Sequence, residues 1–275
     1  MRKSKLHFLF IFLKMIIFTT MFKNIGRSSW NNFRRSEQEY LDYFKYLVET
    51  IDYPLVVYVE NPILKKLVAL ESVKLRSNIM LVDSSTVKTY LDTHLESEKQ
   101  IMNSEAYKQK IPEGRKRAPE HTIPTYTLLN HSKIQFLMHT KKTIPGYDYY
   151  AWIDFGFVRN GKLETLPKNI DFAKLGNKII VNNLYSLPKQ AISAEEMLSK
   201  NETFFAGNSY IVPSSLIEPF QNAYTKKLDE WKAKGIADDD QNLMYQLWVD
   251  DKDMFEILHS GHDNWFALYK DYLNR

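Results

Sequence analysis

An aspartate at the end of an apolar run is the first residue of this sequence that could do chemistry. Asp154 follows the run at residues 150–153, and Gly156 stands two residues later. A continuous apolar run is typical of a strand buried on both faces. A buried carboxylate is costly unless it has a partner, and ligand crevices in open α/β sheets form beyond the carboxyl ends of strands. We therefore expect Asp154 to point into a site that Gly156 leaves accessible; the alternative is a turn aspartate closing an ordinary strand.

Further acids stand before a short amphipathic stretch near the C-terminus. Residues 238–241 read Asp-Asp-Asp-Gln. An acid at a helix N-terminus is ordinary capping, but three in a row exceed what a cap needs. Asp239 and Asp240 are thus candidate site residues, with capping as the alternative. Gly207 lies in a small-residue elbow before a predicted strand, where a ligand can lie against backbone.

Several cations are candidate partners for an anionic ligand. Arg27 follows a glycine after the first predicted strand, and Lys133 stands near the start of a predicted helix. Both could contact phosphate, although Arg27 would also suit a plain surface turn. The basic stretch from Lys108 to Arg117 is expected to be a mobile solvated loop, with a phosphate-gripping role as the alternative.

The composition narrows the classes of ligand and metal that the protein is expected to bind. A net charge of +4 is too small to indicate a nucleic-acid partner, but it suits an anionic ligand or a membrane surface. The chain has no cysteine, so any metal must sit on oxygen or histidine ligands, which favours Mg²⁺ or Mn²⁺. Aromatic residues make up 14% of the chain, which suits carbohydrate stacking as well as a large core.

The elements that must position these residues alternate between strands and helices. This alternation predicts an α/β fold with a mixed, mostly parallel sheet flanked by helices. Strands are predicted at residues 15–22, 53–59, 79–82, 150–153, 178–181, 210–212 and 255–258. Helices are predicted at residues 36–49, 62–74, 132–143, 214–234 and 242–249, with a short helix begun by Ser193 and a closing helix after Trp265.

The N-terminus allows two interpretations. Residues 6–22 are almost wholly apolar after a basic start, which could be a signal peptide or a signal anchor. We favour a short extension over residues 1–14 followed by the first buried strand, and hence one domain over residues 15–275.

Because these motifs follow one another in this order, the chain resembles nucleotide-sugar-dependent glycosyltransferases of the GT-A fold. A closer resemblance is to the HtrL/YibB family, associated with lipopolysaccharide or surface-glycan biosynthesis. It rests on short motifs spread from about residue 15 to residue 269, at residues 25–27, 119–120, 150–156 and 262–265, together with Trp30 and Lys133.

The resemblance implies roles for individual residues, among them Asp239 or Asp240 as the acceptor-side carboxylate or general base. It implies a divalent ion, Mn²⁺ or Mg²⁺, on Asp154 with His259 or His262, and a nucleotide-sugar pocket that includes Gly156, Gly207 and Trp265. In the wider fold the metal motif is Asp-x-Asp. Here its third position is Gly156, so a second ligand must come from elsewhere or metal use is weak.

The resemblance also implies the partners. These are a nucleotide-sugar donor, with a UDP-sugar favoured, and a lipid-linked or surface-glycan acceptor, with no nucleic acid. We expect a cytoplasmic protein with peripheral contact at the inner face of the cell membrane. A non-catalytic glycan- or nucleotide-binding relative and a membrane-anchored scaffold are the alternative functions.

Overall fold

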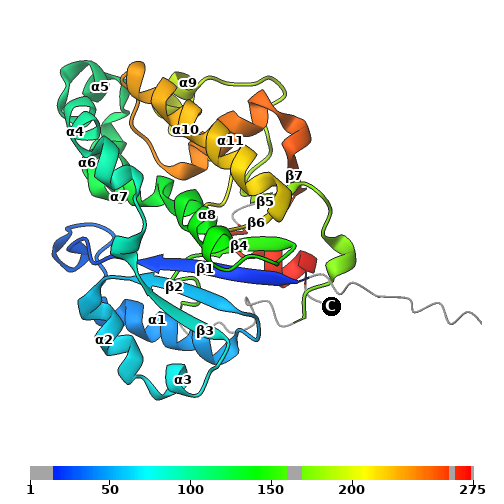
Figure 1. Cartoon of the computed structure of the whole chain (residues 1–275). Coiled ribbons are helices and arrows are strands. Elements are labelled where there is room, and N and C mark those ends of the chain that lie inside the picture. The colour runs from blue at the N-terminus through cyan, green and yellow to red at the C-terminus, as the bar shows by residue number, and fades with distance from the viewer. Residues whose placement is uncertain (1–14, 160–168, 260–263, 274–275) are drawn as a thin grey trace, which may run out of the picture.

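The computed structural model describes residues 15–159, 169–259 and 264–273 (Figure 1). These residues form a seven-stranded sheet in the order β3-β2-β1-β4-β6-β5-β7. The strands are β1 (Ile16–Phe22), β2 (Leu55–Val59), β3 (Ile79–Asp83), β4 (Tyr149–Ile153), β5 (Ile179–Asn183), β6 (Ser209–Pro213) and β7 (Phe255–His259). Only β6 pairs antiparallel to its neighbours, so the other six strands end at one edge of the sheet. The predicted mixed, mostly parallel sheet is confirmed.

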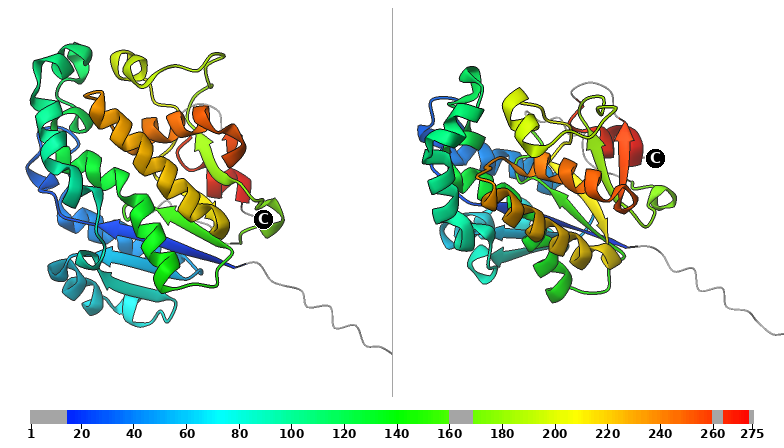
Figure 2. Two further views of the ribbon diagram at one scale, coloured as in Figure 1. Left: turned by 45° about the horizontal axis from the view of Figure 1, so that its top comes forward. Right: turned by 90° about the horizontal axis from the view of Figure 1, so that it is seen from above.

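Helices cover both faces of this sheet. On one face lie α1 (Glu37–Thr50), α2 (Asn61–Ala69) and α3 (Glu71–Lys74); on the other lie α8 (Lys133–Thr143), α10 (Ile217–Ala233) and α11 (Asp240–Asp250) (Figures 1 and 2). Side chains of β1 alternate between the two layers, because Ile17 joins the α8 side while Ile16 and Phe18 join the α1 side. The central strands are therefore buried on both faces, as their continuous apolar runs predicted.

Local capping fixes where several helices begin. At α1, Ser36 accepts a hydrogen bond from the Glu39 backbone while the Glu39 side chain accepts one from Ser36, which is a complete capping box. Ser193 caps α9 (Ala194–Lys200) in a similar way. The predicted helix over residues 62–74 is interrupted at Leu70, whose extended backbone separates α2 from α3.

The prediction of a mobile solvated loop from Lys108 to Arg117 is wrong in part. Four helices occupy the weakly patterned region: α4 (Tyr90–Asn103), α5 (Glu105–Lys110), α6 (Pro119–Thr122) and α7 (Pro124–His131), and a 3₁₀ turn lies at Glu113–Arg115. Tyr107 explains the order of α5, since its buried hydroxyl contacts His121 and donates to the Ala237 carbonyl. This contact is long-range, so the local sequence could not reveal it.

The apolar N-terminal run does contain the first strand. β1 begins at Ile16 and is buried along almost its whole length, which confirms that interpretation of residues 15–22. Residues 1–14 lie outside the described residues, so the extension and the single-domain division stay predictions. No helix in the described part of the chain has the length and apolar content needed to cross a membrane.

Candidate functional site

A cavity of about 570 Å³ opens where β1 and β4 end. Its lining comes from distant parts of the chain: the end of β1 and the segment from there into α1, α7 and the first turn of α8, the end of β4 and the turn after it, the elbow before β6, the start of α11, and residues 265–266. Six parallel strands end at this edge, which is where open α/β sheets form ligand crevices. The order of the sheet thus brings together residues more than 200 positions apart in the sequence.

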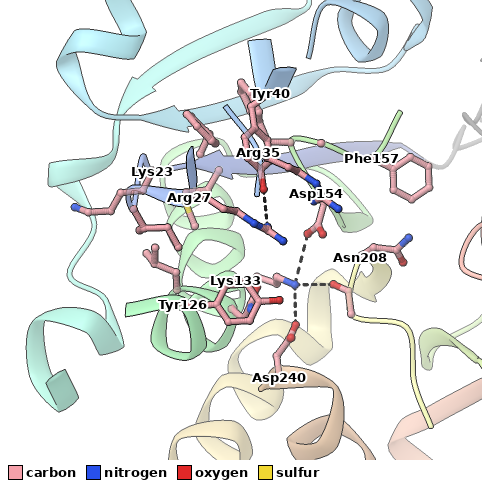
Figure 3. Close-up of a pocket in the computed structure, with 18 of the residues that line it drawn as sticks. Lys23, Arg27, Arg35, Tyr40, Tyr126, Lys133, Asp154, Phe157, Asn208 and Asp240 are labelled. Carbon is pink, nitrogen blue, oxygen red and sulfur yellow. Dashed lines mark hydrogen bonds and ion pairs between the residues drawn. The ribbon is translucent and has the colours of Figure 1, made fainter. Parts of the chain in front are cut away.

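Lys133 occupies the centre of the acidic side of this cavity (Figure 3). Its ammonium group lies 2.8 Å from Asp240 Oδ2 and 3.5 Å from Asp154 Oδ1, and it donates to the Gly207 carbonyl at 2.8 Å. Both acids hold the pKa of Lys133 above its usual value, although burial acts in the opposite direction. Lys133 is therefore a fixed cation that positions two carboxylates and the elbow, whereas we had predicted a phosphate partner.

Gly207 is required by the close approach of α11. A Cβ atom at this position would lie 2.9 Å from Asp240 Oδ2 and 3.0 Å from Gln241 Cγ. Gln241 in turn donates from Nε2 to the Phe205 carbonyl at 2.8 Å. The elbow and the first turn of α11 consequently hold one another in place with no room for a side chain.

The neighbouring acids of α11 have different environments. Asp240 is buried against Lys133, whereas Asp239 caps the helix by accepting from the Gln241 backbone and lines the cavity. Burial raises the pKa of Asp239 well above its usual range, and the nearby Asp238, Asp240 and Glu120 raise it further. Asp238 accepts from Asn242 and the Asp239 backbone, yet burial raises its pKa to about 6. Asp239 is the acid of this group best placed to exchange a proton with a ligand.

Arginines line the opposite side of the cavity. Arg27 donates to the Tyr40 hydroxyl at 2.6 Å and to the Phe33 carbonyl at 3.0 Å, while Arg159 donates to the Gly156 carbonyl at 3.1 Å. Burial lowers the pKa of Arg159, and the positive charges of Arg35 and Arg27 lower it further against an opposing effect of Asp154. Among the described residues, no carboxylate forms an ion pair with any of these three guanidinium groups.

We predicted Arg27 as a site residue, but we missed Arg35 and Arg159. Each stands alone in a loop sequence, and nothing local distinguishes it from a solvated arginine. Only the fold shows that the loops after β1 and β4 bring the three side chains to one cavity wall.

Most other predicted residues also reach the cavity. Gly156 and Trp265 line it, and a Cβ atom at Gly156 would lie 3.1 Å from the Tyr40 ring, so a side chain there would be tightly confined. Asp154 is half-buried and accepts from Trp152 Nε1 at 2.8 Å. These positions agree with the predicted placement, but their roles remain predictions.

Of the two predicted histidine ligands, the structure describes His259 and does not bring it to Asp154. His259 is exposed at the end of β7, 3.3 Å from Asn183 Nδ2, and it does not line the cavity. β7 stands three strands from β4, which corresponds to about 14 Å across a sheet. His262 lies outside the described residues.

The described residues do not fit a tightly held divalent ion. Among them, no three His, Asp or Glu side chains form a group that could hold a metal. Asp154 Oδ1 already accepts from Trp152 and faces Lys133, and Asp240 is engaged by the same ammonium group. Hard cations need several free oxygen ligands, so no step proposed below uses a metal, and the Mn²⁺ or Mg²⁺ prediction awaits a binding test.

Sheet and cavity define a mixed α/β protein with a charged crevice at the carboxyl ends of its parallel strands. The chain belongs to the HtrL_YibB family, because the model of that family, described as "Bacterial protein of unknown function (HtrL_YibB)", matches residues 14–273. The predicted family resemblance is thus confirmed.

One sequence relative and one solved structure are similar to the chain. The chain is 22% identical over 269 residues to Protein HtrL of Escherichia coli (strain K12), covering 91% of this chain and 90% of that protein. It is also similar to a solved structure, the 4-diphosphocytidyl-2C-methyl-D-erythritolsynthase from Anaerococcus prevotii DSM 20548. That similarity has 11% identity and a TM-score of 0.44, and it covers 94% of this chain and 98% of the other.

Proposed function

We propose that the protein is a glycosyltransferase that moves a sugar from a nucleotide-sugar donor to a glycan acceptor. One observation carries the proposal: an arginine wall, formed by Arg27, Arg35 and Arg159, lines the same cavity at the strand ends as Asp154, Asp239 and Asp240. Glycosyl transfer needs both chemistries, because a nucleoside diphosphate must be stabilised as it leaves and an acceptor hydroxyl must lose its proton.

The arginine wall is suited to the donor's diphosphate. The positive charges of Arg35 and Arg27 lower the pKa of Arg159, so the three like charges repel one another, and an anion between them would stabilise them. Guanidinium groups bind phosphate oxygens through paired N–H donors. A diphosphate at this wall would relieve the repulsion, and its charge would be stabilised further as the sugar bond breaks.

The two acids of α11 take separate roles in this proposal. Asp239 is the base that accepts the proton from the acceptor hydroxyl, because it lines the cavity and its raised pKa makes its ionised form a stronger base. Asp240 is held by Lys133 and positions the elbow at Gly207, so it acts on the geometry of the site instead of on the proton.

The acceptor and location follow from the family resemblance. We propose a lipopolysaccharide or another surface glycan as acceptor, a UDP-sugar as the favoured donor, and action in the cytoplasm with peripheral contact at the membrane.

Donor turnover tests the proposal directly. Purified protein is incubated with a panel of nucleotide sugars, with and without an extract of surface glycans, and release of the nucleoside diphosphate is measured. We expect turnover of one donor, strongly reduced in Asp239→Asn and unchanged in Glu195→Gln, a control acid of α9 that does not line the cavity. Failure of every donor to turn over, in a protein shown to be folded, would contradict catalysis.

A non-catalytic relative that binds a nucleotide or glycan is the second candidate. It is favoured by Asp154, whose Oδ1 already accepts from Trp152 and faces Lys133. This alternative predicts nucleotide binding that survives Asp154→Ala, with no sugar transfer to any acceptor. Loss of turnover in a folded Asp154→Ala protein would rule it out.

A further inference from the structure

A second cavity, of about 790 Å³, meets the first at Asp239. The two cavities share Arg27, Phe33, Tyr126, Asp239, Gln241 and Trp265 as lining residues. The remaining wall of the second cavity comes from the region around α6, the segment after β5, the end of α9 and the first turn of α11. Asp239 thus stands where a ligand in one cavity would touch a ligand in the other.

The charge of the second cavity is opposite to that of the arginine wall. Its lining includes Glu120, Asp238, Asp239 and Glu202. Arg115 lies there too, but it is paired with Glu120, and Arg27 belongs to the shared wall. Beyond that shared wall the uncompensated charge is negative, so this cavity disfavours a second phosphate or a uronic acid and admits neutral or amino-bearing ligands.

One buried acceptor in this cavity is without a protein donor. Asn242 is 4% exposed, and its Nδ2 donates to Asp238 Oδ2 at 2.7 Å. Within the described chain, its Oδ1 has no hydrogen-bond partner. Buried polar atoms are normally satisfied, and a hydroxyl of a ligand in the second cavity would supply the missing donor.

Exposed aromatic side chains complete the lining. Phe33 is 57% exposed where the two cavities join, and its φ of 56° lies in the left-handed region that bulky residues avoid. Arg27 holds this conformation through its hydrogen bond to the Phe33 carbonyl. Tyr185 is 36% exposed within the second cavity. Exposed rings beside hydroxyl-binding groups are suited to stack on the apolar face of a sugar.

We propose that the second cavity is a carbohydrate subsite that binds the acceptor as a neutral or amino-bearing oligosaccharide. Phe33 and Tyr185 stack on its rings, and Asn242 accepts a hydrogen bond from one hydroxyl. Bound in this way, the sugar presents a further hydroxyl to Asp239, across from the donor. This inference rests on the proposed glycosyl transfer for its purpose, but the binding of sugar can be measured without donor or turnover.

Three trisaccharides of matched length test the charge and the site. Saturation-transfer NMR and titration would compare neutral tri-N-acetylchitotriose, the triamine formed by removing its acetyl groups, and anionic trigalacturonate. We expect the first two to bind and the third to bind at least about tenfold more weakly, as like-charge juxtaposition requires. Absence of binding by all three would overturn the proposal.

Variants then locate the binding. Phe33→Ala should weaken binding of the neutral trisaccharide by roughly tenfold through loss of one stacking surface. Tyr46→Ala removes an exposed ring that lies outside both cavities, 36% accessible in the structure, and should change nothing. Glu202→Lys should leave the neutral sugar bound and allow trigalacturonate to bind. Equal affinities in Phe33→Ala and Tyr46→Ala, or no gain of anion binding in Glu202→Lys, would overturn the assignment.

The outcome separates this inference from the proposed function. Nucleotide-sugar binding without any trisaccharide binding would leave the donor site standing and remove the acceptor subsite. Trisaccharide binding at this cavity without donor binding would support a glycan-binding protein and remove the transferase.

Discussion

Replacing Lys133 by methionine removes the only cation that touches both Asp154 and Asp240 among the described residues. The Lys133 side chain is 7% exposed and that of Asp240 is 5% exposed, so solvent cannot take over the lost contact. Methionine also cannot donate to the Gly207 carbonyl, which Lys133 reaches at 2.8 Å. The substitution therefore leaves a buried carboxylate and a buried carbonyl without their partner.

The expected loss of unfolding free energy in Lys133→Met is large for a single substitution. Removing one member of a buried ion pair costs about 3–5 kcal/mol, because the remaining charge stays buried. Asp154 adds little to this figure, since its side chain is 32% exposed and water can solvate it. A matched surface change, Lys99→Met, breaks an exposed pair with Glu96 and should cost less than about 1 kcal/mol.

Protonation of Asp240 should reduce the loss of unfolding free energy in Lys133→Met. Burial raises the pKa of Asp240, and Lys133 counteracts that rise. Without Lys133 the folded-state pKa rises further above the unfolded value. The loss of unfolding free energy in Lys133→Met should therefore be smaller when it is measured at pH 5 than at pH 8, because acidification protonates and neutralises Asp240.

Urea denaturation of wild type, Lys133→Met and the double variant Lys133→Met/Asp240→Asn measures these free energies of unfolding. The double variant should recover most of the loss, because it removes both charges. A loss of unfolding free energy in Lys133→Met below about 1 kcal/mol, as expected for an exposed pair, would refute the buried ion pair. A loss that is the same at pH 8 and at pH 5 would also refute it.

Three further predictions follow from neighbouring residues. Gly207→Ala should lower the free energy of unfolding by about 1–3 kcal/mol, because its Cβ would lie 2.9 Å from Asp240 Oδ2; unchanged urea stability would contradict the close packing. Phe33→Gly should raise stability by about 1 kcal/mol, since it relieves a φ of 56°, and a lower melting temperature would show that the ring packs in the fold. Affinity for a nucleotide sugar should increase as the pH is lowered, because Asp239, whose pKa is raised, gains a proton and loses a charge that repels the diphosphate; calorimetry should find this dependence flattened in Asp239→Asn, and a pH-independent wild type would argue against it.

The elements with strong local signals could be predicted from the sequence. The apolar runs of β1, β2 and β4 and the capping box of α1 each carry their information within a few residues. By contrast, α5 and α6 are too short to show a hydrophobic period. Tyr107 orders α5 through a carbonyl 130 positions away, and no local pattern contains that contact.

The acids of the candidate site could be predicted from the sequence, but the partners of its charged side chains could not. Asp154 and Asp239 stand out because acids at a strand end or in a row are unusual. Whether Lys133 faces a phosphate or two carboxylates depends on the sheet order, which sets α8 beside the start of α11. Arg35 and Arg159 have no local signature, and they become meaningful only when the fold places them beside Arg27.

Calorimetric titration of nucleotide sugars into wild type and Arg35→Met, with and without Mn²⁺, is the most direct test of the central claim. Arg35 lines the cavity, and no carboxylate among the described residues is paired with it, so its removal should spare the fold. The account predicts that one nucleotide sugar binds wild type without added metal and that Arg35→Met weakens it at least about tenfold, the loss expected for a charge-assisted phosphate contact. Absence of binding under every condition, or equal binding by Arg35→Met, would contradict the arginine wall as a diphosphate site.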